Sequence, residues 1–156
     1  MAGVQDSAGH EREEAAMKAP PTDAVVQGDG YAVAHLDVLG EGPGFRKVRP
    51  ALGVDAFGVN AIVMPPGYST GNHYHDEQQE LYFVYEGTIE FSFQDGSTHL
   101  LGPGALARVD AQTVRGLRNV SEVPATYLCV GGKDGYVGRD GRRPEGESGG
   151  HGAVSQ

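Results

Sequence analysis

The sequence predicts an all-β protein built as a barrel or jelly roll, and three observations lead to this prediction. Short runs in which apolar and polar residues alternate recur between residues 31 and 130. Turn-forming residues separate these runs, and the chain contains 25 glycines and 9 prolines. No run shows a convincing helical period of about 3.6 residues. Roughly eight or nine short, evenly spaced strands are typical of β-sandwiches and barrels.

The first expected strands occupy residues 31–39 and 45–48, on either side of a glycine-rich turn at 40–44. The next run, residues 54–64, ends at Pro65-Pro66-Gly67. This sequence ends a strand, because proline cannot donate a backbone hydrogen bond. The two histidines that follow, His73 and His75, are therefore expected to begin a new strand.

The clearest predicted hairpin joins residues 81–85 to residues 88–93 through a turn at Glu86-Gly87. In its second strand, Ile89, Phe91 and Phe93 alternate with polar residues. Further strands are expected at 97–101, 105–109, 113–118 and 125–130, with glycine-containing turns between the earlier ones.

The 156-residue chain is predicted to contain one domain with a flexible tail at each end. Residues 1–24 have no apolar stripe and include a Pro20-Pro21 pair, which indicates an N-terminal tail. Residues 138–156 are rich in glycine and have little apolar surface to bury, which indicates a C-terminal tail. The β-barrel domain is expected to span residues 25–137.

Charge and composition argue against several classes of protein. The formal net charge of -9 disfavours binding to nucleic acid, because nucleic-acid-binding proteins need a cationic surface. No apolar run is long enough to cross a membrane, so no membrane association is expected. Cys129 is the single cysteine, which excludes an intrachain disulfide, and the first residues lack a secretory signal. These features predict a cytoplasmic protein.

Two histidines and a carboxylate form a candidate metal site. His73 and His75 are two residues apart, a spacing that in an extended strand directs both imidazoles to one face. Glu80 follows five residues later, so a short loop can return its carboxylate to the same face from the next strand. These donors suit one divalent metal ion, and they accept Fe, Mn, Ni, Zn or Cu. The alternative is a pair of exposed loop histidines.

The spacing of this stretch resembles the first sequence motif of the cupin superfamily. The matching positions, in order, are Gly67, His73, His75, Glu80 and Gly87, separated by five, one, four and six residues. The resemblance implies a single cupin β-barrel of the jelly-roll type, with a metal ion near its centre held by His73, His75 and Glu80. The family includes dioxygenases, sugar isomerases, decarboxylases and non-catalytic binding proteins, so the resemblance implies fold more strongly than reaction.

The second cupin motif keeps its spacing from Gly104 to Asn119 but changes three residues. Asp110 stands where the motif has proline, and Gln112 stands where it has glycine. Arg115 stands where the motif has its last metal-ligating histidine. An inward guanidinium next to a site of net positive charge requires an anion nearby, because arginine does not deprotonate.

Three interpretations of Arg115 remain open. Arg115, together with Tyr82, binds an anionic substrate; Tyr82 has the same strand parity as Glu80 and offers a phenolic hydroxyl. Alternatively, Arg115 pairs internally with an acid such as Asp110 or Glu90, and Tyr82 is an ordinary core residue. In the third interpretation, the domain has lost its metal ion.

Two classes of function follow from these residues. One is a metal-dependent oxygenase or isomerase that acts on a small, anionic metabolite, with its catalytic residues still unknown. The other is a non-catalytic module that binds a metal or metabolite, or that acts through its outer face as a homodimer. Residues 81–85 are apolar on both strand faces, which favours such a homodimer.

Overall fold

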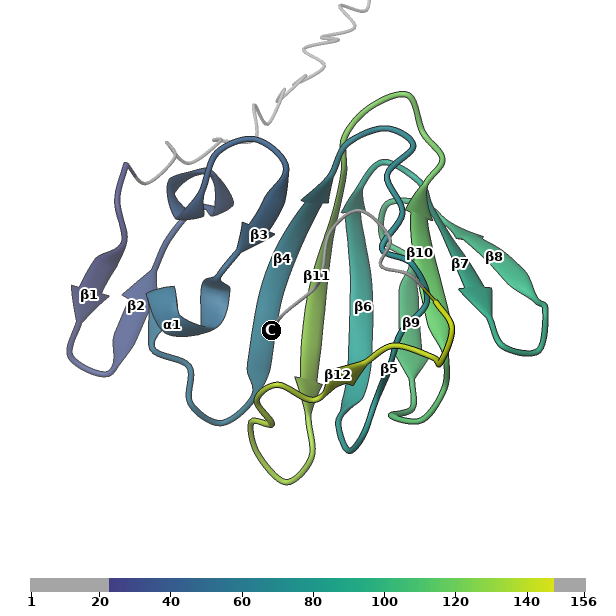
Figure 1. The fold of residues 1–156 in the computed structure, drawn as a ribbon. Helices are drawn as coiled ribbons and strands as arrows, with labels where there is room; N and C mark the ends of the chain where they lie inside the picture. The colour runs from purple at the N-terminus through teal and green to yellow at the C-terminus, as the bar shows by residue number, and fades with distance from the viewer. Residues whose placement is uncertain (1–22, 148–156) are drawn as a thin grey trace, which may run out of the picture.

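The computed structural model describes residues 23–147, which form two facing β-sheets with smaller strand pairs beside them (Figure 1). The larger sheet has five antiparallel strands in the order β3-β4-β11-β6-β9, and the smaller has the order β10-β7-β8. The pairs β1-β2 and β12-β5 complete the described strands. The prediction of an all-β barrel of the jelly-roll type is confirmed.

The strands of the larger sheet are β3 (Gly44–Arg46), β4 (Gly58–Met64), β11 (Ala125–Gly132), β6 (Gln79–Glu86) and β9 (Leu106–Val109). Those of the smaller sheet are β10 (Arg115–Asn119), β7 (Ile89–Phe93) and β8 (Thr98–Leu101). The small pairs are β1 (Val26–Gly28) with β2 (Tyr31–Val33), and β12 (Gly141–Arg142) with β5 (Tyr74–His75). The helical segments of the described region are the 3-10 helix η1 (Leu36–Leu39) and the short α-helix α1 (Val48–Leu52).

The N-terminal strands are shorter than the sequence predicts. The run at 31–39 leaves the β-conformation after Val33 and continues into η1, and the run at 45–48 passes from β3 into α1. The apolar residues of these helical turns pack with Val59 and Ala61 on the outer face of β4. They build a second, smaller core outside the barrel, so their apolar character does not require a strand.

The predicted hairpin between residues 81–85 and 88–93 is wrong. Strand β6 pairs with β11 and β9, whereas β7 pairs with β10 and β8. The turn between them carries the chain from one sheet to the other. Gly87 has a φ of 75°, and a Cβ atom there would lie 2.7 Å from the Cα atom of Ala125. Glycine is therefore required at this crossing both for its backbone angle and for the close approach to β11.

The interior of the barrel divides into an apolar end and a polar end. The apolar end is filled by buried residues of both sheets, including Met64, Val84, Ile89, Phe91 and Leu117. Toward the other end, the same faces carry Tyr82 and Glu80 on β6 and Arg115 on β10, all nearly inaccessible to solvent. Most of the interior excludes water, and charged groups are gathered in one part of it.

Both tails predicted from the sequence fall partly outside the described residues, which exclude 1–22 and 148–156. Within the expected C-terminal tail, β12 pairs with β5, and the Asp140 side chain is buried. Figure 1 shows this segment running alongside the barrel to reach β5. Residues 138–147 therefore contact the strand that carries His75. Among the described residues, none of the helices has the length and apolar composition needed to span a bilayer.

Candidate functional site

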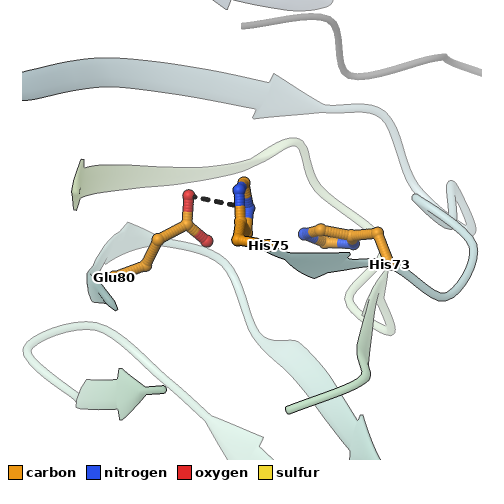
Figure 2. A group of neighbouring side chains, drawn as sticks. All are labelled: His73, His75 and Glu80. Atoms are coloured by element: carbon orange, nitrogen blue, oxygen red, sulfur yellow. Dashed lines mark ion pairs between the residues drawn. The ribbon is translucent and has the colours of Figure 1, made fainter. Parts of the chain in front are cut away.

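The residues with the first-motif spacing converge at the polar end of the barrel. His75 belongs to β5, and Glu80 lies near the start of β6. His73 pairs with Arg115 through two backbone hydrogen bonds of 2.9 Å, so both side chains project from the same face of this pair. Potential ligand atoms of His73, His75 and Glu80 lie within 4.8 Å of one another. Figure 2 shows these three side chains, with the ion pair between His75 and Glu80 drawn as a dashed line.

Arg115 points into the barrel and is 0% exposed. Its Nη2 atom lies 2.5 Å from Oε2 of Glu80, and its Nε atom donates to the Tyr82 hydroxyl at 3.2 Å. Its Nη1 atom donates to the backbone oxygen of Thr113 at 2.9 Å and to that of Ala111 at 3.4 Å. The guanidinium is thus held on three sides by groups of the protein.

Of the three interpretations of Arg115, the internal ion pair is the one that is observed. The sequence suggested an acid such as Asp110 or Glu90 as the partner of Arg115. The observed partner is Glu80. Asp110 instead accepts a hydrogen bond from Gln79 and lies 3.5 Å from Nε of Arg108. The motif assigns the carboxylate of Glu80 to a metal ion, so the sequence does not indicate Glu80 as the partner of Arg115.

Both oxygens of the Glu80 carboxylate are engaged. Oε2 accepts hydrogen bonds from Arg115 and from the hydroxyl of Tyr82. Oε1 lies 3.1 Å from Nε2 of Gln78 and 3.2 Å from Nε2 of His75. Burial alone raises the pKa of Glu80, but the hydrogen bond from His75 and the charge of Arg115 outweigh burial and lower that pKa below its usual value. The carboxylate is therefore ionised throughout the neutral range.

His75 is held by neighbours on both ring nitrogens and is only 3% exposed. Its Nε2 atom faces Glu80, and its Nδ1 atom lies 3.0 Å from Nε2 of Gln78. Asp140 lies immediately before β12, and its Oδ2 atom is 3.7 Å from Nδ1 of His75. The Asp140 carboxylate accepts the backbone N–H groups of Glu77 at 3.0 Å and Gln78 at 2.8 Å. It thereby fixes the turn that connects His75 to Glu80.

His73 is the partly exposed member of the group. Burial, followed by the positive charge of Arg115, lowers the pKa of His73 to about 4. This imidazole is therefore neutral at pH 7, and it offers a nitrogen lone pair at the edge of the centre. Among the three candidate ligands, it is the one best placed to meet a molecule that enters from solvent.

Tyr82 and Cys129 line the same part of the interior. The Tyr82 hydroxyl donates to Glu80 and accepts from Arg115, so Tyr82 is part of the centre as well as of the core. Burial and the charge of Glu80 raise the pKa of Tyr82 well above its usual value, and they do the same for the Cys129 thiol. Cys129 stays protonated at neutral pH and acts as a small buried side chain, as the sequence predicts.

Two residues of the centre were missed by sequence reasoning. Gln78 has the strand parity of Glu80, which could have suggested an inward side chain but not its contact with His75. Asp140 lies in a segment predicted to be a flexible tail, and no local pattern marks it. Its role depends on a contact across more than 60 residues of chain, since it bonds to Gln78 with a sequence separation of 62.

A pocket of about 240 Å³ is lined by Phe45 and Ile62, on β3 and β4, and by Tyr68 and Thr70 on the segment that precedes His73. Ile62 is in register with Tyr127, and Tyr127 is in register with Val84, which fills the apolar end of the barrel. The pocket therefore lies toward the apolar end, and its lining includes none of the charged residues of the centre.

Comparison with known proteins gives a family match for the central part of the chain. Residues 60–131 match the family model described as a cupin domain. No match was found among curated proteins.

Three solved structures are similar to this chain over about half of its length. A sugar phosphate isomerase of the cupin superfamily from Silicibacter pomeroyi is 33% identical over 56% of this chain, with a TM-score of 0.52. A chain from crystal structures of DMSP lyases is 25% identical over 57% of this chain, with a TM-score of 0.51. A protein from Klebsiella pneumoniae with a double-stranded beta-helix domain is 23% identical over 51% of this chain, with a TM-score of 0.48. The match spans 57%, 44% and 69% of the length of these proteins, respectively.

Proposed function

Residues 60–131 of this chain are a cupin domain, and on that premise we propose that the protein binds a small molecule inside the barrel, next to His73. The observation that carries this proposal is the cluster of buried polar groups at one end of an otherwise apolar interior. Burying such groups is unfavourable unless they are paired, and arrangements of this kind are concentrated at functional sites.

We propose that the ligand is a small anionic metabolite. The relative from Silicibacter pomeroyi is described as a sugar phosphate isomerase, and its substrate class is anionic at neutral pH. Arg115 is the backbone partner of His73, and after burial its positive charge is the next cause that lowers the pKa of that imidazole. In this proposal His73 hydrogen-bonds the ligand, while Arg115, held by Glu80 and Tyr82, contributes its charge from within the barrel without touching the ligand.

A thermal-shift panel of sugar phosphates and small carboxylates tests this proposal. A ligand that binds the folded state raises Tm in proportion to its concentration relative to its dissociation constant. We expect at least one anionic compound to raise the Tm of the wild-type protein but not that of a His73→Ala variant. His35→Ala is the matched control, because His35 lies at the exposed start of η1. A compound that stabilises all three proteins equally binds elsewhere and contradicts the proposed site.

A metal-dependent oxygenase or isomerase is a second candidate function. The observation that favours it is that ligand atoms of His73, His75 and Glu80 lie within 4.8 Å of one another. In this candidate these residues hold one ion of Fe, Mn, Ni, Zn or Cu, which supplies Lewis-acid or redox chemistry. It requires the observed contacts of Glu80 with Arg115 and His75 to open. Turnover of a sugar phosphate or oxygen uptake by the metal-loaded protein, absent after chelation, tests this candidate.

We also propose that the protein forms a homodimer through the outer face of β6 and β9. Leu81, Phe83 and Tyr85 on β6 and Leu106 on β9 are exposed there, and Phe83 and Leu106 are neighbours across the two strands. The N-terminal segment packs on the outer face of β4, and Figure 1 shows it at the left, beside β3 and β4 and away from β6 and β9. It leaves the β6–β9 face without a covering element among the described residues. Contiguous apolar surface of this kind marks interaction sites.

A further inference from the structure

We propose that this cupin centre works without a metal ion, because the guanidinium of Arg115 takes the place of the metal as the cation bound by Glu80. The inference concerns the construction of the centre and does not depend on which small molecule binds beside it. It rests on how the donor atoms of Glu80, His75 and Arg115 are already engaged.

The carboxylate of Glu80 is already bound by neighbouring side chains. A metal ligand needs a lone pair that points at the ion, but Oε2 already accepts two hydrogen bonds, from Arg115 and Tyr82. The contact with Arg115 is a charge-assisted bond of 2.5 Å between groups that are 0% and 1% exposed. Bonds of this type are among the strongest in proteins. An ion could reach Oε2 only if this buried pair separated.

The contacts of Gln78 determine the tautomer of His75. The amide nitrogen of Gln78 lies 3.1 Å from Oε1 of Glu80 and 3.0 Å from Nδ1 of His75. A carboxylate oxygen accepts only, so the Gln78 group next to it must be the donating NH2 and not the carbonyl oxygen. The second N–H of this amide then points to Nδ1, which must accept. His75 therefore carries its proton on Nε2 and donates it to Glu80, at 3.2 Å.

This tautomer removes His75 as a ligand at the centre. A neutral imidazole has one lone pair, and here that lone pair is directed to Gln78, away from the space between His75 and Glu80. A metal-ligating histidine has the opposite arrangement, with its second nitrogen donating to an outer partner. Of the three candidate ligands, only His73 keeps a lone pair at the centre.

The charge of Arg115 also opposes a metal ion at this centre. Arg115 cannot deprotonate, so a divalent ion near Glu80 would lie beside a permanent positive charge in a buried site. The pair of Arg115 and Glu80 is neutral as it stands, whereas two imidazoles, a carboxylate, a divalent ion and Arg115 would together carry two positive charges. The residues present therefore do not fit a divalent metal ion. They form a closed hydrogen-bonded network that is preorganised without one.

The metal content of the purified protein distinguishes a metal-free centre from a centre that holds a divalent ion. The wild-type protein is incubated separately with Mn, Fe, Co, Ni, Cu and Zn, dialysed, and measured by element-resolved mass spectrometry. We expect retention well below one ion per chain and no metal-dependent rise in Tm. The matched variant is Arg115→His, which removes the guanidinium and supplies a third imidazole. We expect it to retain about one ion per chain and to gain Tm with metal.

Each result supports or overturns the inference. Retention of one ion per chain by the wild-type protein overturns it without reference to any variant. A folded Arg115→His protein that takes up no metal overturns the role assigned to Arg115. If Arg115→His does not fold, Arg115→Gln serves instead, because it removes the charge and keeps amide donors; it is expected to show a metal-dependent rise in Tm that the wild-type protein lacks.

The tautomer of His75 is a second, independent readout. Long-range ¹H–¹⁵N correlation spectra of the wild-type protein distinguish a proton on Nε2 from a proton on Nδ1. We expect the Nε2–H form in the wild-type protein. An Nδ1–H form would leave Nε2 available to a metal ion, and it would overturn the conclusion that His75 is not a metal ligand. A Gln78→Leu variant is expected to lose the fixed Nε2–H form while the fold is maintained.

Discussion

Arg115 and Glu80 form a buried ion pair whose contribution to stability depends on both partners being present. Two opposite charges in the interior recover the cost of their desolvation only through good geometry and further hydrogen bonds. Tyr82, Thr113 and Gln78 supply those additional bonds here. Removal of one partner leaves the other charge buried and uncompensated, so single substitutions should be far more damaging than a paired replacement.

Replacement of Glu80 by glutamine is therefore expected to lower the free energy of unfolding by about 3–5 kcal/mol, the range for breaking a buried ion pair. Urea denaturation followed by circular dichroism measures this change. Glu86→Gln is the matched control, since Glu86 lies at the exposed end of the same strand, and its effect should stay within about 0.5 kcal/mol. Adding Arg115→Met to Glu80→Gln should restore part of the loss. If the double variant is less stable than either single variant, the pairing does not determine the effect.

The histidine at the edge of the centre makes stability depend on pH. The folded-state pKa of His73 is about 4, below the usual value of 6.5, so the unfolded chain binds a proton first as the pH falls. The contribution of His73 is complete above about pH 6.5 and is lost between about 6.5 and 4. The total loss from this group is at most about 3 kcal/mol.

Chemical denaturation at a series of pH values checks this dependence. A His73→Gln variant should show a flatter curve between about pH 6.5 and 4.5, whereas the exposed His35→Gln control should follow the wild-type curve. Glu80 contributes in a lower window, because its lowered pKa makes its stabilisation fall only below the unfolded-state value near 4.5. An unchanged slope in His73→Gln would show that His73 is not the titrating group.

At the scale of elements, the segment that follows the cupin match supports the centre from outside. Strand β12 pairs with β5, Arg142 lies 2.6 Å from Asp76, and Asn72 donates to Glu147 at 2.7 Å. Asp140 accepts two backbone N–H groups of the turn between His75 and Glu80. The position of the motif strand thus depends on residues 138–147 as well as on the barrel.

Asp140→Ala is expected to destabilise the protein by about 1–3 kcal/mol, because it leaves two backbone N–H groups without their acceptor. Hydrogen exchange measured by mass spectrometry should show faster exchange in peptides that cover residues 75–80. Glu145→Ala is the control, since this exposed residue lies in the same segment. Equal exchange in the two variants would mean that the segment does not order the turn.

At the scale of the whole molecule, the described residues cover the outer face of the larger sheet over β4 but not over β6. Val59 and Ala61 on β4 pack against η1, α1 and the loops around them. Leu81, Phe83 and Tyr85 on β6 are 45%, 37% and 62% exposed. Apolar exposure on three successive outward positions of one strand exceeds the scattered exposure that is normal for a monomer, and it is the basis of the proposed homodimer.

Light scattering coupled to size-exclusion chromatography should give a dimer mass for the wild-type protein. Phe83→Lys should shift the protein to a monomer, because it introduces a charge at the centre of the proposed interface. Leu100→Lys is the matched control: Leu100 is 68% exposed, but it lies on β8 in the other sheet. A monomeric wild-type protein, or an equal effect of both variants, would contradict an interface on β6 and β9.

Local patterns allowed much of this molecule to be predicted. Alternation along 88–93 and the turn at Gly87 predicted the strands, because side chains two residues apart share a face whatever the strand pairs with. The same alternation could not show that β6 and β7 belong to different sheets, since pairing is decided by distant strands. The apolar residues of η1 and α1 were misassigned for a related reason: their partner, the outer face of β4, is remote in sequence.

The all-β class, the cupin spacing from Gly67 to Gly87 and the convergence of His73, His75 and Glu80 follow from the sequence alone. These properties depend on strand parity and short loops, which act over a few residues. Only the tertiary structure decided that Arg115 pairs with Glu80 and that Gln78 and Asp140 secure His75. Those contacts join residues more than 60 positions apart, as for Asp140 with Gln78 and His75, and buried charges select their partners by proximity after the chain has folded.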